Sequence, residues 1–168
     1  MLASIPLRLL ATPCALLITL LSSAGCCGAP RPAGGKGTAT PIRVDEVQAV
    51  LDVQREAWNR GDLEGFMATY ERSEQLGFVG SSGLTRGWDR TLANYRRGYP
   101  DAAARGRLDF ELVAVRPLGD EHAIVVGRFH LERSAPADGW FTLLVARSPA
   151  GLVILHDHSS EASPPRRT

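Results

Sequence analysis

The stretch Gly-Leu-Val-Ile-Leu-His-Asp-His-Ser-Ser, residues 151–160, joins a short apolar run to five polar residues. The succession of Leu, Val, Ile and Leu favours a β-strand with buried side chains. A strand that ends in two histidines, an aspartate and two serines either lines a polar pocket or ends in solvent. The rest of the sequence is needed to choose between these two interpretations.

Three more strand-like segments precede this stretch, at residues 107–116, 122–133 and 140–147. Short breaks containing Pro, Gly, Ser and Asp separate them. Because connections of this length join neighbouring antiparallel strands, we expect a meander of four strands.

Helical patterns occupy the first part of the same domain. Apolar residues recur at helical spacing within residues 44–60, and Gly61 and Asp62 are suited to end that helix and to cap a short second one. Residues 77–85 indicate a short hairpin, and a third helix is predicted over residues 88–98. Helices followed by strands predict an α+β fold with the helices on one face of the sheet.

Six local motifs occur in this order: Trp58 through Phe66, Phe78-Val79-Gly80, Tyr95 through Pro100, Gly127-Arg128-Phe129, Phe141 through Leu144, and His156 through Ser160. Together they resemble the nuclear transport factor 2-like superfamily, and within it the SnoaL-like proteins and the bacterial family related to the association domain of the calcium/calmodulin-dependent kinase. The resemblance implies a cone-shaped fold, in which three N-terminal helices pack on a curved, mainly antiparallel sheet of four to six strands, commonly in a homodimer. It implies no single activity, because the superfamily contains isomerases, dehydratases, cyclases and noncatalytic assembly modules.

Alternation along a regular strand sorts the side chains near the end of the chain. His156 and His158 fall on the same face as the apolar residues Leu152 and Ile154, and Asp157 falls on the opposite face. We therefore expect the two histidines, and not the aspartate, to face the interior of the cone. A β-bulge in this strand would reverse that assignment.

The expected pocket combines basic groups with aromatic walls. We expect Arg128 and His130 to point into the cone beside His156 and His158, and the walls to be formed by Trp58, Tyr70, Tyr95 and Tyr99. A largely apolar pocket with a few convergent polar groups is typical of a small-molecule site.

The candidate catalytic residues are His156, His158 and Arg128. A neutral histidine can take up a proton near neutral pH, and an arginine can stabilise an oxyanion. In the alternative, structural interpretation the histidines have ordinary partners at a strand end and Arg128 pairs with an acid. With Asp157 on the other face, a carboxylate base is not expected.

Three histidines, His130, His156 and His158, also raise the question of a metal site. No cysteine and no clear carboxylate ligand accompanies them, and Arg128 would lie close to the cation. We therefore expect no metal and no cofactor.

The first residues have the pattern of an export signal. Arg8 precedes an apolar segment, residues 9–21, that is too short for a comfortable membrane span, and Ala24-Gly25-Cys26 resembles the end of a bacterial lipobox. We expect a lipid on Cys26 and attachment to the membrane of the cell envelope; the alternative is cleavage after Ala24 and a soluble secreted or periplasmic protein. The predicted organisation is a signal peptide (1–25), a flexible linker (26–42), one folded domain (43–162) and a disordered tail (163–168).

Composition limits the partners of the domain. The 168-residue chain is 44% hydrophobic and has a formal net charge of +1, which gives no electrostatic basis for binding nucleic acid. We expect a homodimer that contacts the membrane through its lipid only. It either binds a small apolar or carbonyl-containing molecule in its cone or serves as an assembly module; the alternative is a small isomerase, hydrolase or dehydratase that uses histidine acid–base chemistry.

Overall fold

The computed structural model describes residues 40–162. The signal peptide, Cys26, nearly all of the linker and the tail lie outside the described residues. Within residues 40–162 no helix has the length and apolar character needed to cross a membrane.

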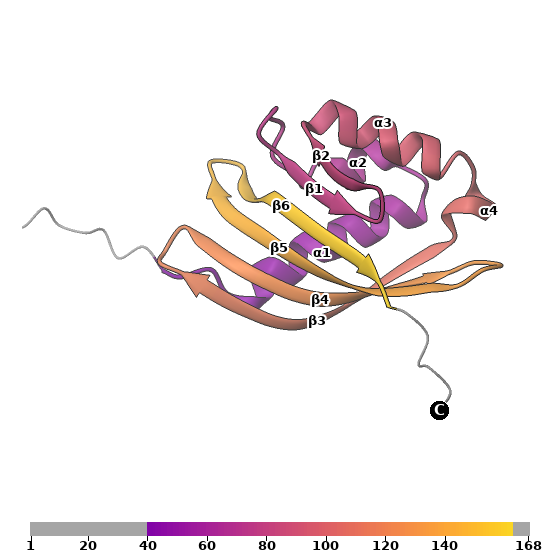
Figure 1. Ribbon diagram of the computed structural model, residues 1–168. Coiled ribbons are helices and arrows are strands. Elements are labelled where there is room, and N and C mark those ends of the chain that lie inside the picture. The colour runs from indigo at the N-terminus through magenta and orange to yellow at the C-terminus, as the bar shows by residue number, and fades with distance from the viewer. Residues whose placement is uncertain (1–39, 163–168) are drawn as a thin grey trace, which may run out of the picture. The chain divides into compact units, whose positions relative to one another are not determined.

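The described chain forms two helices, a hairpin, two more helices and four long strands (Figure 1). The helices are α1 (Val44–Asn59), α2 (Leu63–Met67), α3 (Trp88–Gly98) and α4 (Ala102–Arg105). The strands are β1 (Gly77–Gly80), β2 (Gly83–Arg86), β3 (Arg107–Leu118), β4 (His122–Glu132), β5 (Ala137–Ser148) and β6 (Gly151–Glu161).

All six strands belong to one sheet, in the order β2-β1-β6-β5-β4-β3. Strands β3 to β6 pair antiparallel in sequence order, which confirms the predicted meander. The hairpin β1–β2 joins the free edge of β6 through a parallel pairing, so the sheet is mixed. The α+β class and the number of strands agree with expectation.

The helices differ from the expected three. A fourth, short helix, α4, forms at residues 102–105, because the Asp101 carboxylate accepts a hydrogen bond from the Ala104 backbone N–H at 2.8 Å. An aspartate in this position is a favourable N-cap, and the alanines that follow are strong helix formers.

The junction after α1 fixes this helix against the sheet. Gly61 adopts a positive φ of 84°, and the Asp62 side chain accepts from the Gly65 backbone N–H at 2.7 Å to start α2. The Asn59 amide donates to the Leu108 carbonyl at 2.9 Å and accepts from the Leu108 N–H at 2.8 Å. These paired bonds attach the end of α1 to the first residues of β3.

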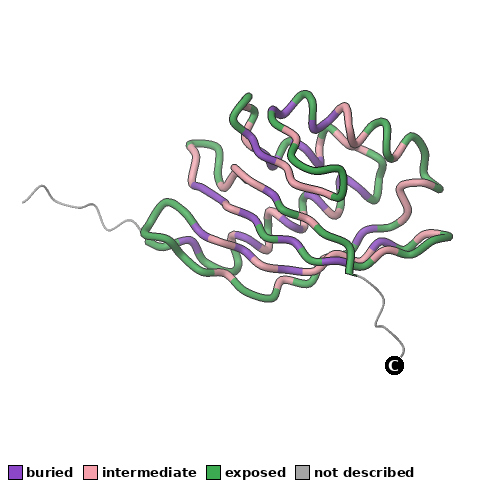
Figure 2. The backbone as a smooth tube through the Cα atoms, viewed as in Figure 1, coloured by how far each residue is buried: buried purple, intermediate pink, exposed green. Residues whose placement is uncertain are grey.

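The sheet has an inner face, turned toward α1, α2 and α3, and an outer face turned away from them (Figure 1). Buried and more exposed residues alternate along the long strands (Figure 2), as expected where one face of a sheet is covered. Val125, Leu143 and Ile154 on the inner face pack in one core with Leu51 and Met67 of the helices.

Candidate functional site

One extra residue in β6 decides which side chains reach the inner face. Ile154 and His156 pair with consecutive residues of β5, so that Leu155 is left over as a β-bulge. Ile154 is fully buried on the inner face, and after the bulge it is Asp157 that returns to that face. A bulge shifts the alternation of a strand by one residue, so the pattern that holds before Leu155 is reversed after it.

The structure corrects the orientation expected for His156 and His158. Both lie on the outer face, away from the cavity, because the bulge at Leu155 reverses the alternation. His156 lies against Gly77 of β1, where a Cβ atom would come within 2.5 Å of its Nδ1, and His158 is exposed.

Arg128 and His130 also lie on the outer face, which corrects the same expectation for β4. Their inner-face neighbour Phe129 lines the cavity instead. Arg128 forms an ion pair with Glu111 at 3.5 Å, and His130 Nδ1 lies 2.6 Å from a carboxylate oxygen of Asp138. The three candidate catalytic residues, His156, His158 and Arg128, are therefore outside the cavity.

A cavity of about 660 Å³ lies between the inner face and the helices. Its walls include the four aromatic residues predicted from the sequence, and Phe66, Phe78 and Phe129 extend them; the four are Trp58, Tyr70, Tyr95 and Tyr99. The rings pack edge to face, with 4.7 Å between the centroids of Trp58 and Tyr99 and 5.2 Å between those of Phe66 and Tyr95. Such contacts hold the aromatic walls in place.

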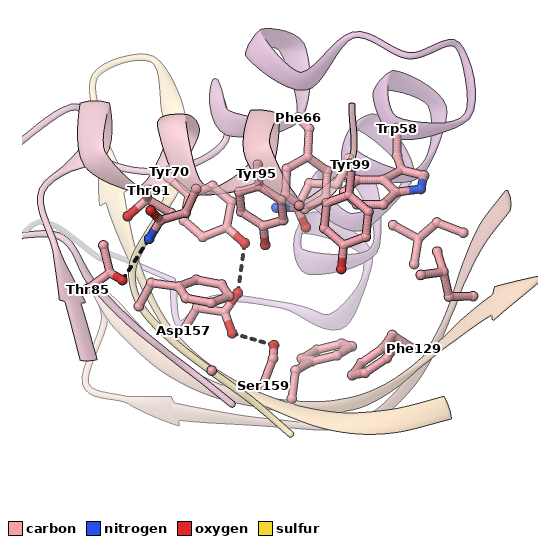
Figure 3. Close-up of a pocket in the computed structure, with 18 of the residues that line it drawn as sticks. Trp58, Phe66, Tyr70, Thr85, Thr91, Tyr95, Tyr99, Phe129, Asp157 and Ser159 are labelled. Atoms are coloured by element: carbon pink, nitrogen blue, oxygen red, sulfur yellow. Dashed lines mark hydrogen bonds between the residues drawn. The ribbon is translucent and has the colours of Figure 1, made fainter. Parts of the chain in front are cut away.

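A small polar cluster lies on the sheet side of this cavity (Figure 3). The Tyr70 hydroxyl donates to one Asp157 carboxylate oxygen at 2.7 Å, and the Ser159 hydroxyl donates to the other at 2.7 Å. Asp157 is only 4% exposed, and no arginine forms an ion pair with it in the described part of the chain. We call Tyr70, Asp157 and Ser159 the Asp157 cluster.

Burial governs the acid–base properties of this cluster. It raises the pKa of Asp157 above its ordinary value, and the hydrogen bonds from Ser159 and Tyr70 oppose that rise only in part. Burial and the nearby Asp157 charge raise the pKa of both Tyr70 and Tyr95 well above the usual range. The site therefore holds a carboxyl group that keeps its proton more firmly than an aspartate in water.

The mouth of the cavity is polar. The β1–β2 turn contributes Ser81 and Ser82, and α3 contributes Asn94 and Arg97. The Asn94 amide donates to the Thr85 hydroxyl at 3.0 Å, which ties α3 to β2 (Figure 3), and the exposed Arg97 guanidinium donates to Asn94.

Sequence reasoning missed Asp157, Ser159 and Gln54 as residues of the cavity. Nothing local marks the bulge that turns the first two inward. The sequence did indicate an unusual role for Gln54, since this polar residue lies on the helical face that also bears the apolar residues Leu51 and Trp58. Among residues 40–162 no cluster of three or more histidine, cysteine or acidic side chains is arranged to hold a metal ion.

Solved structures with the same fold were found by comparison. No protein-family model matches the chain, and no curated protein matches it either. An NTF-2 like protein of unknown function from Shewanella oneidensis is 41% identical, with a TM-score of 0.67 over 71% of this chain and 99% of that one.

Two further structures share the fold at lower identity. A ketosteroid isomerase-like protein from Erwinia carotovora is 19% identical, with a TM-score of 0.58 over 71% of this chain and 96% of that one. A protein from Thiobacillus denitrificans, named for the association domain of calcium/calmodulin-dependent protein kinase type II, is 21% identical, with a TM-score of 0.60 over 74% and 98% of the two chains. With the fold, the cavity and the Shewanella relative taken together, the chain belongs to the nuclear transport factor 2-like family.

Proposed function

We propose that the chain binds a small, mainly apolar molecule in its cavity and that the Asp157 cluster makes the polar contact with it. The observation that supports this most is the Asp157 carboxyl group, which is buried among aromatic rings with two hydroxyl groups as its partners and no cation from the described part of the chain. Burying an acid in this way costs stability, and groups of this kind concentrate at functional sites.

The size and lining of the cavity define the ligand further. A volume of about 660 Å³ suits a molecule of two or three rings. The aromatic walls favour an apolar ring system, while Asp157 accepts a hydrogen bond when ionised and donates one when protonated. The ligand therefore carries at least one hydroxyl or carbonyl group.

Binding can be tested with 2-naphthol and naphthalene, which differ by one hydroxyl group. In ¹H–¹⁵N spectra of the full chain, the Trp58 indole reports on the cavity wall, whereas Trp140 is 45% exposed on the outer face. We expect 2-naphthol to shift the Trp58 signal and leave the Trp140 signal in place. Asp157→Leu should lower the preference for 2-naphthol over naphthalene about tenfold.

Asp138→Leu is the matched control, because Asp138 is a carboxylate of the outer face. It should leave the preference unchanged. If neither compound shifts the Trp58 signal, or if the preference survives Asp157→Leu, the proposed function is incorrect.

A second candidate function is proton transfer to or from a bound carbonyl compound. It is favoured by the raised pKa of Asp157, because a carboxylate whose pKa is raised by burial is a stronger base than an aspartate in water. Asp157 takes the place of the histidines that the sequence suggested, since those lie outside the cavity. Exchange of the α-protons of 2-acetylnaphthalene in D₂O, followed by NMR, should be accelerated by the wild type and not by Asp157→Asn; equal rates would rule this candidate out.

We also infer that the chain assembles as a homodimer through the outer face. Trp140 is 45% exposed there, and the half-buried Ile124, Val126 and Leu144 lie on the same face. Apolar side chains of this size gathered on one sheet face favour a protein partner. The fold shared with the association-domain protein of Thiobacillus denitrificans supports assembly of like chains.

Export and lipid attachment at Cys26 are proposed from the sequence alone. The apolar segment 9–21 and the motif Ala24-Gly25-Cys26 support them. Labelling of cells with an alkyne-bearing fatty acid should mark the wild type and not Cys26→Ala; label on both, or on neither, would contradict the proposal.

A further inference from the structure

Gln54 lies in an environment that a glutamine seldom occupies. It belongs to the buried face of α1, is only 2% exposed, and lines the cavity. A primary amide buried without hydrogen bonds costs free energy, so buried amides almost always have partners.

The Gln54 Nε2 atom is fully buried and has no hydrogen-bond partner among the described residues. The nearest acceptor is the Tyr70 hydroxyl oxygen, toward which the Gln54 amide acts as a donor and lowers the Tyr70 pKa, while the hydroxyl proton itself is donated to Asp157 at 2.7 Å. The amide nitrogen carries two N–H groups, so at least one of them is left over beside the Asp157 cluster even when the other points at Tyr70.

Trp58 repeats this arrangement one helical turn later. It is 3% exposed, lines the cavity, and its indole Nε1 is also buried with no hydrogen-bond partner among residues 40–162. Residues four apart lie on the same side of a helix, so α1 brings two side chains with unpaired N–H groups to the lining of the cavity. An indole N–H only donates, as does the amide nitrogen of glutamine, and what both lack is an acceptor.

The charges around the cavity limit what this acceptor is. Its lining includes the acid Asp157 and a single basic residue, Arg97, which is exposed at the mouth and bonded to Asn94. A ligand carboxylate beside Gln54 would be buried near another acid without a cation, which is costly. A neutral carbonyl oxygen avoids that cost.

We propose that Gln54 determines specificity at this site by donating its unpaired N–H to a neutral carbonyl oxygen of the ligand. This inference rests on the proposed function and adds to it the class of ligand, a two- or three-ring ketone, aldehyde or amide. Trp58 is a second buried donor in the lining of the same cavity.

The test uses two probes of closely similar shape, 2-acetylnaphthalene and 2-isopropenylnaphthalene, in which a CH₂ group replaces the carbonyl oxygen. Both are titrated into the full chain, and binding is followed by the Trp58 indole signal. Gln54→Met keeps the volume of the side chain and removes the N–H, so it should lower the preference for the ketone at least fivefold. Gln48→Met is the matched control, because Gln48 lies on the same helix, does not line the cavity and is bonded to Asp52 at 3.2 Å.

Thermal unfolding without probe gives a second measurement. Because Gln54→Met removes an unpaired buried donor, its unfolding midpoint should rise by a few degrees above that of the wild type. A fall would mean that the amide has a good partner in the free protein, and it would overturn the inference.

The outcomes separate the two proposals. If both probes bind and Gln54→Met leaves the ketone preference unchanged, the role of Gln54 is incorrect while the binding function stands. If neither probe shifts the Trp58 signal, the proposed function fails and this inference fails with it.

Discussion

The two faces of the sheet carry their ionisable groups in opposite ways. On the outer face Arg128 and His130 lie beside the acids Glu111 and Asp138, all of them at least partly in contact with solvent. On the inner face Asp157 is buried with two hydroxyl groups and, within residues 40–162, no cation. Exposed ion pairs contribute little to stability, whereas a buried unpaired acid opposes folding, so the inner face is where a functional reason is needed.

This difference depends on the single residue Leu155. Residues on either side of it in β6 alternate regularly, but the bulge shifts the alternation so that Asp157, and not His156, follows Ile154 onto the inner face. An insertion of one residue in a strand thus exchanges the chemistry of the two faces without changing the pairing of the strands.

The largest expected effect comes from filling space on the inner face. A Cβ atom on Gly127 would meet the Phe141 ring and lie 2.7 Å from the Glu111 backbone oxygen. Gly127→Val should therefore lower the free energy of unfolding by about 3 kcal/mol or more, measured by urea denaturation. On the exposed outer face, Thr142→Val should change it by less than about 0.5 kcal/mol. Equal effects at both positions would show that the inner face is not tightly packed.

The outer face is tested through its exposed tryptophan. If a second copy covers this face, Trp140→Asp should raise the dimer dissociation constant about a hundredfold, because buried tryptophans contribute strongly to interfaces. Sedimentation velocity over a range of concentrations measures it. Val53→Asp, at an exposed apolar position of α1, is the control and should leave the dimer intact. A wild type that sediments as a monomer throughout would refute the dimer.

The inner acid is tested by the pH dependence of stability. Because burial raises the pKa of Asp157 in the folded protein, the folded state holds this proton more tightly than the unfolded chain does. The wild type should therefore lose stability as the pH rises from the ordinary aspartate pKa through the raised one, and Asp157→Asn should not. Urea denaturation from pH 4 to 8 should show that the free energy of unfolding of the variant, relative to that of the wild type, increases with pH. A relative decrease with pH would mean that the cluster stabilises the ionised carboxylate.

Local patterns were sufficient to predict most of the fold. Helical spacing predicted α1 and α3, because a helix repeats its faces according to local sequence alone, and Trp58 and Tyr95 on these helices line the cavity. The meander followed from short turns between strands. The parallel pairing of β1 with β6 was not predicted, because it joins segments far apart in the chain.

The polar part of the site could not be predicted either, because it also depends on contacts between segments far apart in the chain. The bulge at Leu155 lies beside Ile154, whose backbone N–H donates to Thr69 and whose carbonyl accepts from Glu71, both at 2.9 Å. These contacts come from the segment that follows α2, so the sequence of β6 alone does not contain them. Alternation assumed to be regular therefore placed the histidines inside and Asp157 outside.

The smallest expected effect is that of removing both histidines. In the double variant His156→Asn and His158→Asn, 2-naphthol should shift the Trp58 signal with an affinity within about twofold of the wild type. The imidazoles lie on the outer face and act on Asp157 only as charges, the weakest of the influences on its pKa. They lower that pKa, so their removal should at most strengthen the hold of Asp157 on its proton.

This variant tests the assignment of the two faces, because it changes two ionisable groups on the outer face and none on the inner face. Asp157→Leu changes a single group between them in sequence and should abolish most of the selectivity for 2-naphthol. A tenfold loss of affinity in a folded histidine variant would mean that the imidazoles take part in binding, and the assignment of the two faces would have to be reversed. Near-equality with the wild type would leave one carboxyl group, turned inward by one bulge, as the polar contact of the cavity.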